Sequence, residues 1–401
     1  MLTRFSYHKV YKVYFTPLFT MSHSIEHYPR GREFRVLVLE YVTATFKCRN
    51  QYDALLPEGF SMAYTLAKLL NKYVETRIAV SRLLAHVYRD DIDIAHYIDC
   101  NYFEENVSKI AEEYNKIIVI APPMELVRLA EIVGRKIWGP STNSIQLFSD
   151  KYNSMMILRR CGIAVPETVE VRDVSNIDLK SLEYPVVVKP CMLAGSECVY
   201  IARSPSDAER YIIRALRCDP LRRAVVQQYI RGIHGSISTI ISNGKILFYS
   251  VNKQIIELDG NAFRYRGNIL PVRDCEIVKN VHRFLTKLIQ CYNDIEGYIG
   301  FDIVMWNGKP IVVEVNPRLT TPFIAIARLY PEVGKIIVNA MMNRNFDTHI
   351  YLGDVASGIA IVTISERESD TQRLFFDESS FTYRGRELRI SIDKLNSWNK
   401  C

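Results

Sequence analysis

The sequence lacks any long hydrophobic run, so no membrane-spanning helix is expected. Its longest apolar stretches, such as residues 117–121 and 358–364, fall well short of the roughly 18 to 20 residues that cross a bilayer. Internal repeats and low-complexity tracts are also missing, and the composition excludes disordered, collagen-like and fibrous classes. With 48% hydrophobic and 24% charged residues in 401, the composition is that of a globular protein of roughly two to three domains.

Closely spaced cysteine pairs are absent as well. The nine cysteines are odd in number and scattered, and none of them forms a C-x-x-C motif. This pattern argues against a structural zinc site and against a disulfide framework. We therefore expect reduced cysteines and a cytoplasmic location.

Positive charge is in excess, mainly at the N-terminus. The net charge is +7, and the first 35 residues hold six Lys and Arg against two Glu, which gives 6 − 2 = +4 there. These residues lack the continuous apolar region and the cleavage site of a secretory signal. We expect residues 1–34 to be a flexible basic extension. The alternative is an arm that binds a membrane surface or nucleic acid, although nucleic acid is not the expected partner.

Residues 35–145 alternate between strand and helix patterns. The segment FRVLVLEYV at 34–42 is a short apolar run, typical of a strand buried on both faces. Apolar residues at helical spacing predict a helix over 60–70. Further strands are expected at 76–80, 116–121 and 136–138, and a further helix at 125–133. Such an open α/β domain binds ligands beyond the carboxyl ends of its strands.

Residues 146–345 change to an α+β pattern, in which strands come in pairs. Two lobes are expected, at 146–225 and 226–345. Helices are expected at 149–161, 206–217 and 275–292, and strands at 185–190, 198–203, 224–230, 236–242, 245–252, 298–306 and 310–316. Residues 346–401 are expected to be a C-terminal extension with strands at 356–364 and 388–392.

The most informative polar side chains lie in a predicted hairpin. Odd positions on both of its strands are apolar, whereas Asp302, Glu314 and Asn316 occupy even positions. A two-residue turn at Asn307-Gly308 would pair 302 with 313 and separate the two acids. A three-residue loop at 306–308 would pair 302 with 312 and place both acids on one face. We expect the three-residue loop.

Two carboxylates and an amide oxygen on one face of a hairpin are oxygen ligands of the kind that Mg²⁺ prefers. We therefore expect Asp302, Glu314 and Asn316 to form a metal site. Arg318, just beyond the second strand, adds a planar donor group suited to phosphate or carboxylate. The alternative is a solvent-exposed sheet face, on which these residue types are common.

Two lysines upstream of the hairpin are placed to meet a phosphate. Lys189 ends the apolar run VVVK, and Lys151 lies at the start of a helix. Lys189 is followed by a loop that contains Gly195-Ser196, whose backbone N–H groups can surround an anion. We expect residues 191–198 to be a lid over phosphates, with an ordinary hairpin turn as the alternative.

In their order along the chain, these segments resemble the ATP-binding core of the ATP-grasp superfamily of ligases, over residues 145–340. The matching features are Asp150-Lys151, Val188-Lys189-Pro190, Gly195-Ser196, Gln227-Gln228-Tyr229-Ile230, Gly300-Phe301-Asp302 and Glu314-Val315-Asn316-Pro317-Arg318. The sequence departs from the family pattern where Gln227 or Gln228 replaces a common Glu and where Cys198 replaces a common Gly. The resemblance implies a two-lobed ATP-grasp core behind the α/β domain.

The resemblance also implies a role for each residue. It assigns the phosphates of ATP to Lys151, Lys189, Gly195 and Ser196. It assigns adenine to the hinge residues Gln227, Gln228, Tyr229 and Ile230. Two Mg²⁺ ions, with Mn²⁺ as an alternative metal, are assigned to Asp302, Glu314 and Asn316. Arg318 steadies an acyl-phosphate and forms the expected catalytic pair with Lys189.

The implied reaction is the ATP-dependent joining of a small-molecule carboxylate to an amine through an acyl-phosphate. A homodimer is expected. Two alternatives remain open. One is an enzyme of the biotin carboxylase type, which activates bicarbonate. The other is a non-catalytic protein that binds nucleotide or nucleic acid.

Two N-terminal segments resemble an archaeal branch of the superfamily that includes tyramine–L-glutamate ligase. They are VLEYVT at 38–43 and LLPEGFSM at 55–62, although Ala44-Thr45-Phe46 replaces glycines that are frequent there. Glu40 and Glu58 are candidates to bind an amine substrate. The alternative for Glu40 is a half-buried strand end, and for Glu58 it is an acid at a helix start.

Overall fold

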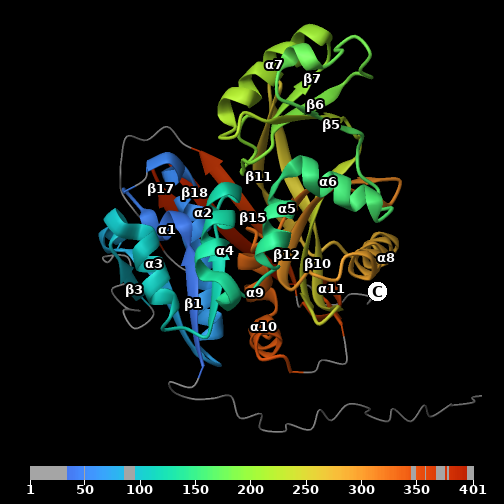
Figure 1. The fold of residues 1–401 in the computed structure, drawn as a ribbon. Coiled ribbons are helices and arrows are strands. Elements are labelled where there is room, and N and C mark those ends of the chain that lie inside the picture. Colours follow the sequence, from blue (N-terminus) through green and yellow to red (C-terminus); the bar gives the residue numbers. More distant parts are fainter. Residues whose placement is uncertain are drawn as a thin grey trace, which may run out of the picture.

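The computed structural model describes residues 34–48, 50–84, 95–344, 349–356, 358–366, 375–376 and 379–394. The basic extension expected at 1–34 lies outside these residues, apart from Phe34. Figure 1 shows an N-terminal body, a central sheet and, at the top, a small lobe. Within the described residues, no helix has both the length and the apolar character needed to cross a membrane.

The N-terminal body is built on a four-stranded parallel sheet with the order β3-β2-β1-β4. Its strands are β1 (Arg35–Glu40), β2 (Glu75–Ser81), β3 (Ala95–Ile98) and β4 (Lys116–Ile120). The strand expected at 136–138 is wrong, because Gly134–Lys136 is a 3-10 helix and only Ile137 forms an isolated bridge, to Ile117. The fourth strand is β3, which the sequence reading missed.

Helices connect and cover the strands of this sheet. They are α1 (Tyr41–Thr45), α2 (Leu56–Leu70), α3 (Phe103–Ala111) and α4 (Pro123–Val133). Helix α2 has Pro57 in its first turn and buries Phe60, Leu66 and Leu70 against the sheet. The helix expected at 149–161 is confirmed as α6 (Lys151–Arg160), and α5 (Thr142–Ser149) precedes it as a separate helix, because Asp150 has extended backbone and caps α6.

The order of the parallel strands creates a crevice beside β1. The chain runs from β1 outward to β2 and β3, and then returns to place β4 on the other side of β1. Such a reversal is where open α/β sheets bind ligands, beyond the carboxyl ends of the strands. Glu40 and Ile120 end β1 and β4 as register partners. The crevice therefore opens between these two residues.

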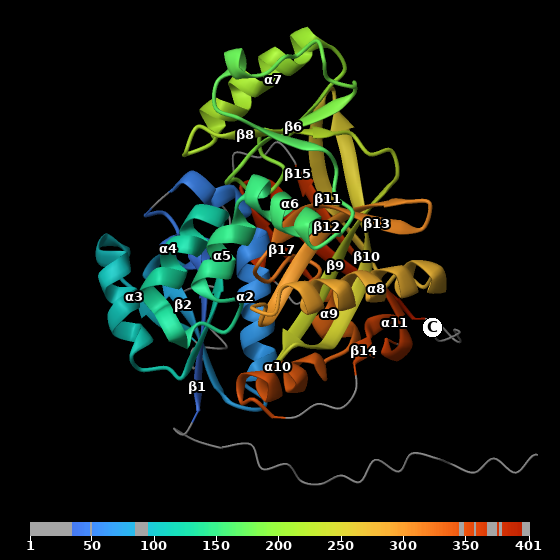
Figure 2. The same ribbon diagram turned by 45° about the vertical axis from the view of Figure 1, so that its right-hand side comes forward.

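The central sheet is antiparallel in the order β13-β12-β9-β10-β11. Its strands are β9 (Ile233–Ser242), β10 (Lys245–Asp259), β11 (Ala262–Leu270), β12 (Gly297–Trp306) and β13 (Lys309–Asn316). The strands expected here are confirmed, with β10 longer than expected and β11 in addition. Helix α8 (Cys275–Cys291) lies across it (Figure 2), and α9 (Phe323–Leu329) and α10 (Val333–Met341) follow β13.

Alternation along β12 separates a core from a cavity. The odd residues Ile299, Phe301 and Ile303 are buried in one apolar cluster with α6 and α8, and the rings of Phe301 and Phe284 lie 5.1 Å apart. Asp302 is on the opposite face, as the predicted period of two requires. The apolar core on one face therefore fixes the polar side chains on the other.

The small lobe consists of a sheet in the order β5-β8-β6-β7 and a single helix packed against it. Its elements are β5 (Thr168–Val171), β6 (Val186–Pro190), β7 (Tyr200–Ala202), α7 (Pro205–Cys218) and β8 (Ala224–Gln228). Tyr200 of β7 pairs with Ala262 of β11, which joins the lobe to the central sheet. In Figure 2 the lobe lies beyond the ends of β10 and β11.

The C-terminal strands join the central sheet to the N-terminal body. They are β14 (Ile350–Tyr351), β15 (Gly358–Glu366), β16 (Phe375–Phe376), β17 (Ser380–Tyr383) and β18 (Arg386–Lys394), with α11 (Leu352–Val355) between the first two. β15 pairs with β11. On β17, Phe381 lies 4.9 Å from Phe60 of α2, and Tyr383 lies 5.2 Å from Phe46, as measured between ring centroids.

Candidate active site

Asp302 and Glu314 meet across the hairpin of β12 and β13 through a β-bulge. The turn is the two-residue Asn307-Gly308, whose φ values of 49° and 72° fit a type I′ turn. The expected three-residue loop is therefore wrong. Asp302 nevertheless pairs with Glu314, because the register shifts before Ile303 and leaves Val313 as the extra residue. The two acids share a face because of a bulge in the middle of the hairpin.

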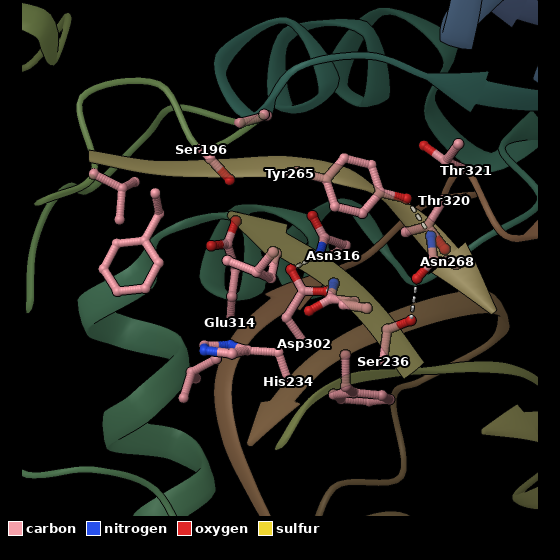
Figure 3. Close-up of a pocket in the computed structure, with 18 of the residues that line it drawn as sticks. Ser196, His234, Ser236, Tyr265, Asn268, Asp302, Glu314, Asn316, Thr320 and Thr321 are labelled. Carbon is pink, nitrogen blue, oxygen red and sulfur yellow. Dashed lines mark hydrogen bonds between the residues drawn. The ribbon is translucent and has the colours of Figure 1, made fainter. Parts of the chain in front are cut away.

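Asp302 is held by two amide side chains. Gln254 Nε2 donates to Oδ1 at 2.7 Å, and Asn316 Nδ2 donates to Oδ2 at 3.3 Å. Figure 3 shows Asp302, Glu314 and Asn316 gathered in the same cavity. Burial, followed by the charge of Glu314, raises the pKa of Asp302 to about 7. The two carboxylates therefore repel each other, and burial removes part of the water that would otherwise screen them.

Both lysines predicted from the sequence reach this hairpin. Lys189, at the end of β6, is 7% exposed, and its Nζ donates to the carbonyl oxygen of the bulge residue Val313 at 3.2 Å. Burial lowers the pKa of Lys189 to about 8. Lys151, the first residue of α6, is 3% exposed, and its Nζ lies 3.2 Å from Glu314 Oε1. Two ammonium groups thus face the acidic pair.

The loop after Lys189 has two parts. Cys191, Met192 and Leu193 are buried, and Met192 N–H donates to Asp219 Oδ2 at 2.7 Å. Residues 194–198 turn outward, with positive φ at Gly195, Ser196 and Cys198. Only this second part has the exposure expected of a phosphate-binding loop.

Two disulfides in the described chain contradict the expectation of reduced cysteines. Cys198–Cys218 ties the outward part of the loop to the last residue of α7, and Cys161–Cys291 ties the end of α6 to the end of α8. Cys48 and Cys275 are also disulfide-bonded. The partners are 20 and 130 residues apart and are brought together by helix packing, which cysteine spacing does not reveal. Cys191 is a buried free thiol.

The hinge residues end β8, between the small lobe and the central sheet. Gln227 is 1% exposed, and its Nε2 donates to Thr168 Oγ1 at 3.2 Å, whereas Gln228 is exposed. Tyr229 and Ile230 follow and are half-buried. Gln227 is thus held by its neighbour strand, while the other three residues remain accessible.

One cavity joins nearly all of the residues predicted from the sequence. It is lined by Lys189, Gly195, Ser196, Gln227, Gln228, Tyr229, Ile230, Asp302, Glu314, Asn316 and Arg318. Lys151 does not line it and acts on it through Glu314. Charges suited to phosphates, oxygen ligands suited to a divalent cation and an accessible hinge therefore face one space.

Residues 148–322 match the family model described as the ATP-grasp domain. This segment is an ATP-grasp domain. It contains both lysines, the loop, the hinge and the hairpin, so the recognition made from the sequence is confirmed.

Similarity to individual proteins extends beyond the ATP-grasp domain. The carbamoyl phosphate synthase large chain of Archaeoglobus fulgidus is 24% identical over 55% of this chain but only 21% of its own length. The tyramine–L-glutamate ligase of Methanocaldococcus jannaschii is 23% identical over 77% of this chain and 89% of its own length. The solved structure of a putative ATP-grasp superfamily protein from A. fulgidus covers 90% of this chain and 100% of its own, with a TM-score of 0.60 and 21% identity.

Arg318 follows β13 of the ATP-grasp domain and points its charge toward the acidic pair. Its Nη1 donates to the carbonyl oxygen of Leu319 at 3.0 Å, and its Nη2 donates to Asn316 Oδ1 at 3.4 Å. Burial lowers its pKa, and the charges of Glu314, Asp302 and Glu40 oppose that shift. The guanidinium is thus oriented by backbone and amide oxygens and retains donors for a ligand.

The sequence reading missed a group of polar residues on β9, β10, β11 and the segment that follows β13. They line the same cavity, and all except Gln254 are labelled in Figure 3: Ser236, Gln254, Tyr265, Asn268, Thr320 and Thr321. Asn268 is fully buried, and its Nδ2 donates to the hydroxyl of Tyr265. Polar residues at every second position of otherwise apolar strands, such as Ser250, Asn252 and Gln254, were the signal for this group.

The two N-terminal acids have different surroundings. Glu58 is paired with Arg386 of β18, with Nε 3.0 Å from Oε1. Glu40 caps α1, because it accepts from Val42 N–H at 3.2 Å and from Thr43 N–H at 2.7 Å. Both line the same cavity as the acidic pair. Neither of the simple alternatives, a half-buried strand end or an acid at a helix start, describes them fully.

Proposed function

We propose that this chain is an ATP-dependent ligase that joins a carboxylate to an amine through an acyl-phosphate. One observation carries the proposal: a single cavity is lined by the lysine end of β6, the acidic hairpin, Arg318 and the crevice of the N-terminal sheet. A nucleotide, a carboxylate and an amine can therefore meet in one cavity. The match of residues 148–322 to the ATP-grasp domain supports the same proposal.

ATP is proposed to lie between the small lobe and the central sheet. Lys189 and Lys151 supply positive charge to its phosphates, and the N–H groups around Gly195 and Ser196 surround them. Adenine is assigned to the hinge residues Gln227, Gln228, Tyr229 and Ile230. The cavity contacts of the hinge, together with its position between the two lobes, support this assignment.

The donor set of the acidic hairpin fits Mg²⁺. Asp302, Glu314 and Asn316 offer oxygen atoms, and a divalent cation would offset the burial and the repulsion from Glu314 that together raise the pKa of Asp302. We propose two Mg²⁺ ions, with Mn²⁺ as a substitute. When bound, the metal would neutralise phosphate charge and hold the γ-phosphoryl group in line.

Arg318 and Lys189 are proposed to make the first step possible. A carboxylate must approach the γ-phosphate of ATP, and the two anions repel each other. Fixed guanidinium and ammonium groups reduce this repulsion at low cost, because other contacts already orient them. The carboxylate oxygen then attacks phosphorus, ADP leaves, and the acyl-phosphate forms.

The relatives guide the choice of substrates. The tyramine–L-glutamate ligase of M. jannaschii is similar to this chain over 89% of its own length, which extends beyond the ATP-grasp segment 148–322. We propose that the carboxylate belongs to an amino acid and that the nucleophile is a primary amine. L-Glutamate and tyramine are the first pair to test.

Three further expectations belong to the proposal. We assign residues 35–145 to a substrate-binding α/β domain, 146–345 to the ATP-grasp core and 346–401 to a C-terminal extension. We predict a homodimer. We also propose the cytoplasm as the site of reaction.

The proposal is tested by measuring ADP release with Mg·ATP and a panel of carboxylates and amines, singly and in pairs. We expect release to depend on both substrates and to match amide formation one to one. ADP release that requires only bicarbonate would instead support an enzyme of the biotin carboxylase type. No ADP release under any condition, with retained ATP binding, would support a non-catalytic protein.

A further inference from the structure

The crevice at the reversal of the N-terminal sheet opens into the ATP-grasp cavity. Glu40 and Ile120 end the neighbouring strands β1 and β4, and both line the cavity. An open parallel sheet binds ligands at this place, beyond the carboxyl ends of its strands. The ATP-grasp domain contributes the metal and phosphate residues, so this crevice supplies room for a different ligand.

The carboxylate of Glu40 is fixed within the crevice. It accepts from Val42 N–H at 3.2 Å and from the N–H and hydroxyl of Thr43 at 2.7 Å and 2.5 Å. Helix α2 comes so close that a Cβ on Gly59 would lie 2.6 Å from the carboxyl atoms of Glu40. Backbone therefore encloses the group on these sides, and the cavity that it lines is the remaining approach.

Glu40 differs in charge balance from the second acid in the crevice. Glu58 is neutralised by Arg386, whose Nε and Nη2 both contact its carboxylate. Among the described residues, no Lys, Arg or His forms an ion pair with Glu40. Arg318 acts on it only through longer-range attraction. A buried carboxylate without a cation is costly, and a cationic ligand would offset that cost.

The rest of the N-terminal wall of the cavity is apolar. Apart from Glu40, Gly59 and the paired Glu58, it consists of Val42, Leu55, Met62, Ile120, Ala121 and Pro122. Such a wall accepts hydrocarbon and leaves a second charged group on the ligand unpaired. The ligand that fits is a primary ammonium group on an apolar body.

We propose that this crevice is the subsite of the amine substrate, in which Glu40 receives the ammonium group and the apolar wall receives the carbon body. The inference rests on the proposed function, because it names the place of the nucleophile in that reaction. It also explains why the subsite faces the metal and Arg318 end of the cavity, where the acyl-phosphate forms.

Glu40 is also placed to accept a proton. The ammonium nitrogen must lose one proton before its electron pair can attack the acyl carbon, and burial raises the pKa of Glu40 to about 7. The C–N bond forms, the bond from carbon to the phosphate oxygen breaks, and phosphate leaves with that electron pair. Of the two protons lost by nitrogen, one passes through Glu40 to water and the other leaves on phosphate.

The test separates the two half-reactions with Glu40→Gln. Hydroxylamine is small and uncharged at neutral pH, so it traps the acyl-phosphate as a hydroxamate without an ammonium subsite. With L-glutamate as the acid and tyramine as the amine, or the best pair from the ADP screen, we expect Glu40→Gln to raise the KM for the amine at least tenfold. Hydroxamate formation and ATP affinity should stay within about threefold of wild type.

Thr43→Val is the matched control for the capping role. It removes a hydrogen bond to the same carboxylate but keeps the charge, so the KM for the amine should change little while Tm falls. An unchanged KM in Glu40→Gln, with a lower Tm, would make Glu40 a helix cap only and overturn the inference. Equal loss of hydroxamate and amide at native Tm would overturn it as well, because Glu40 would then serve the first step.

The proposed function can fail separately from this inference. If wild-type protein forms neither hydroxamate nor amide with any carboxylate, the ligase proposal falls, and the amine subsite falls with it. If wild-type protein forms both products and only the amine dependence of Glu40→Gln is normal, the ligase proposal stands and the subsite is wrong.

Discussion

Lys189 donates a hydrogen bond to the carbonyl oxygen of Val313, the bulge residue that brings Asp302 and Glu314 together. The ammonium group of Lys189 thus connects the small lobe to the acidic hairpin. The bulge frees that carbonyl from the strand ladder, and the lysine occupies it. Assembly of the phosphate and metal residues therefore depends on the same local irregularity.

Loss of either acid should abolish most activity without unfolding the protein. Asp302→Asn and Glu314→Gln each remove a charge from the metal site at nearly constant volume, and each relieves repulsion. We expect kcat to fall at least a hundredfold in both variants, with Tm equal or higher in Asp302→Asn and lower in Glu314→Gln, which leaves the buried Lys151 without its partner. Glu167→Gln, at a carboxylate that is 78% exposed in the same domain, is the control. Full activity of both variants at limiting Mg²⁺ would contradict the metal assignment.

Lys189→Ala should weaken ATP binding more than it weakens binding of the amine. The ammonium group is buried beside the acidic hairpin, and its removal leaves the phosphates without a fixed partner. Calorimetry with a non-hydrolysable ATP analogue should show at least a tenfold loss of affinity. Lys309→Ala, at an exposed lysine of β13, should bind normally. Lys151→Ala should be similarly severe, because Lys151 is 3% exposed and paired with Glu314.

Within the loop 191–198, only residues 194–198 should close over the phosphates when nucleotide binds. Residues 191–193 are already buried, so only the outward part can gain protection. Hydrogen exchange should slow at 194–198 when Mg²⁺ and an ATP analogue are added, and the Asn243-Gly244 turn should not change. Equal exchange with and without nucleotide would make the loop an ordinary turn.

Reduction should destabilise the protein through Cys161–Cys291. This bond closes a loop of 130 residues, for which chain entropy gives roughly 4 to 5 kcal/mol. Cys161→Ser should therefore unfold at a markedly lower denaturant concentration than wild type. Added reductant should lower the unfolding midpoint of wild type toward that of the variant. Cys191→Ser, at the buried free thiol, should keep its sensitivity to reductant. A wild-type midpoint that ignores reductant would contradict the bond.

Ionisation of Glu40 should cost stability as the pH rises. Burial raises its pKa from 4.5 to about 7, so the folded protein binds this proton more tightly than the unfolded chain does. Stability is therefore lost between pH 4.5 and 7, on the order of 3 kcal/mol. The Tm of Glu40→Gln minus the Tm of wild type should therefore be larger at pH 8 than at pH 5. The exposed Glu105→Gln should show the same difference at both pH values.

Periodicity predicted the parts of the site that follow regular strands. Asp302 faces the cavity because the odd residues of β12 are apolar, and Lys189 ends β6 because VVVK is a buried strand. The pairing of Asp302 with Glu314 required an irregularity at Val313, and no residue type at that position reveals it. The predicted three-residue turn was wrong for the same reason. Placing both acids on one face requires one bulge in the hairpin, and the sequence favoured Gly308 as its position.

Long-range contacts account for most of what the sequence did not reveal. The pairing of Cys161 with Cys291 depends on how α6 packs against α8, and that of Glu58 with Arg386 depends on where β18 meets α2. These partners are separated by 130 and 328 residues. Neither composition nor local spacing carries information at such distances.

The central claim is that a carboxylate is activated as an acyl-phosphate in this cavity. Isotope transfer tests it most directly, with a substrate whose carboxylate oxygens are both ¹⁸O. The account predicts that each amide formed is accompanied by one inorganic phosphate carrying a single ¹⁸O atom, and that Asp302→Asn abolishes the transfer. Unlabelled phosphate, or AMP and pyrophosphate in place of ADP and phosphate, would contradict it.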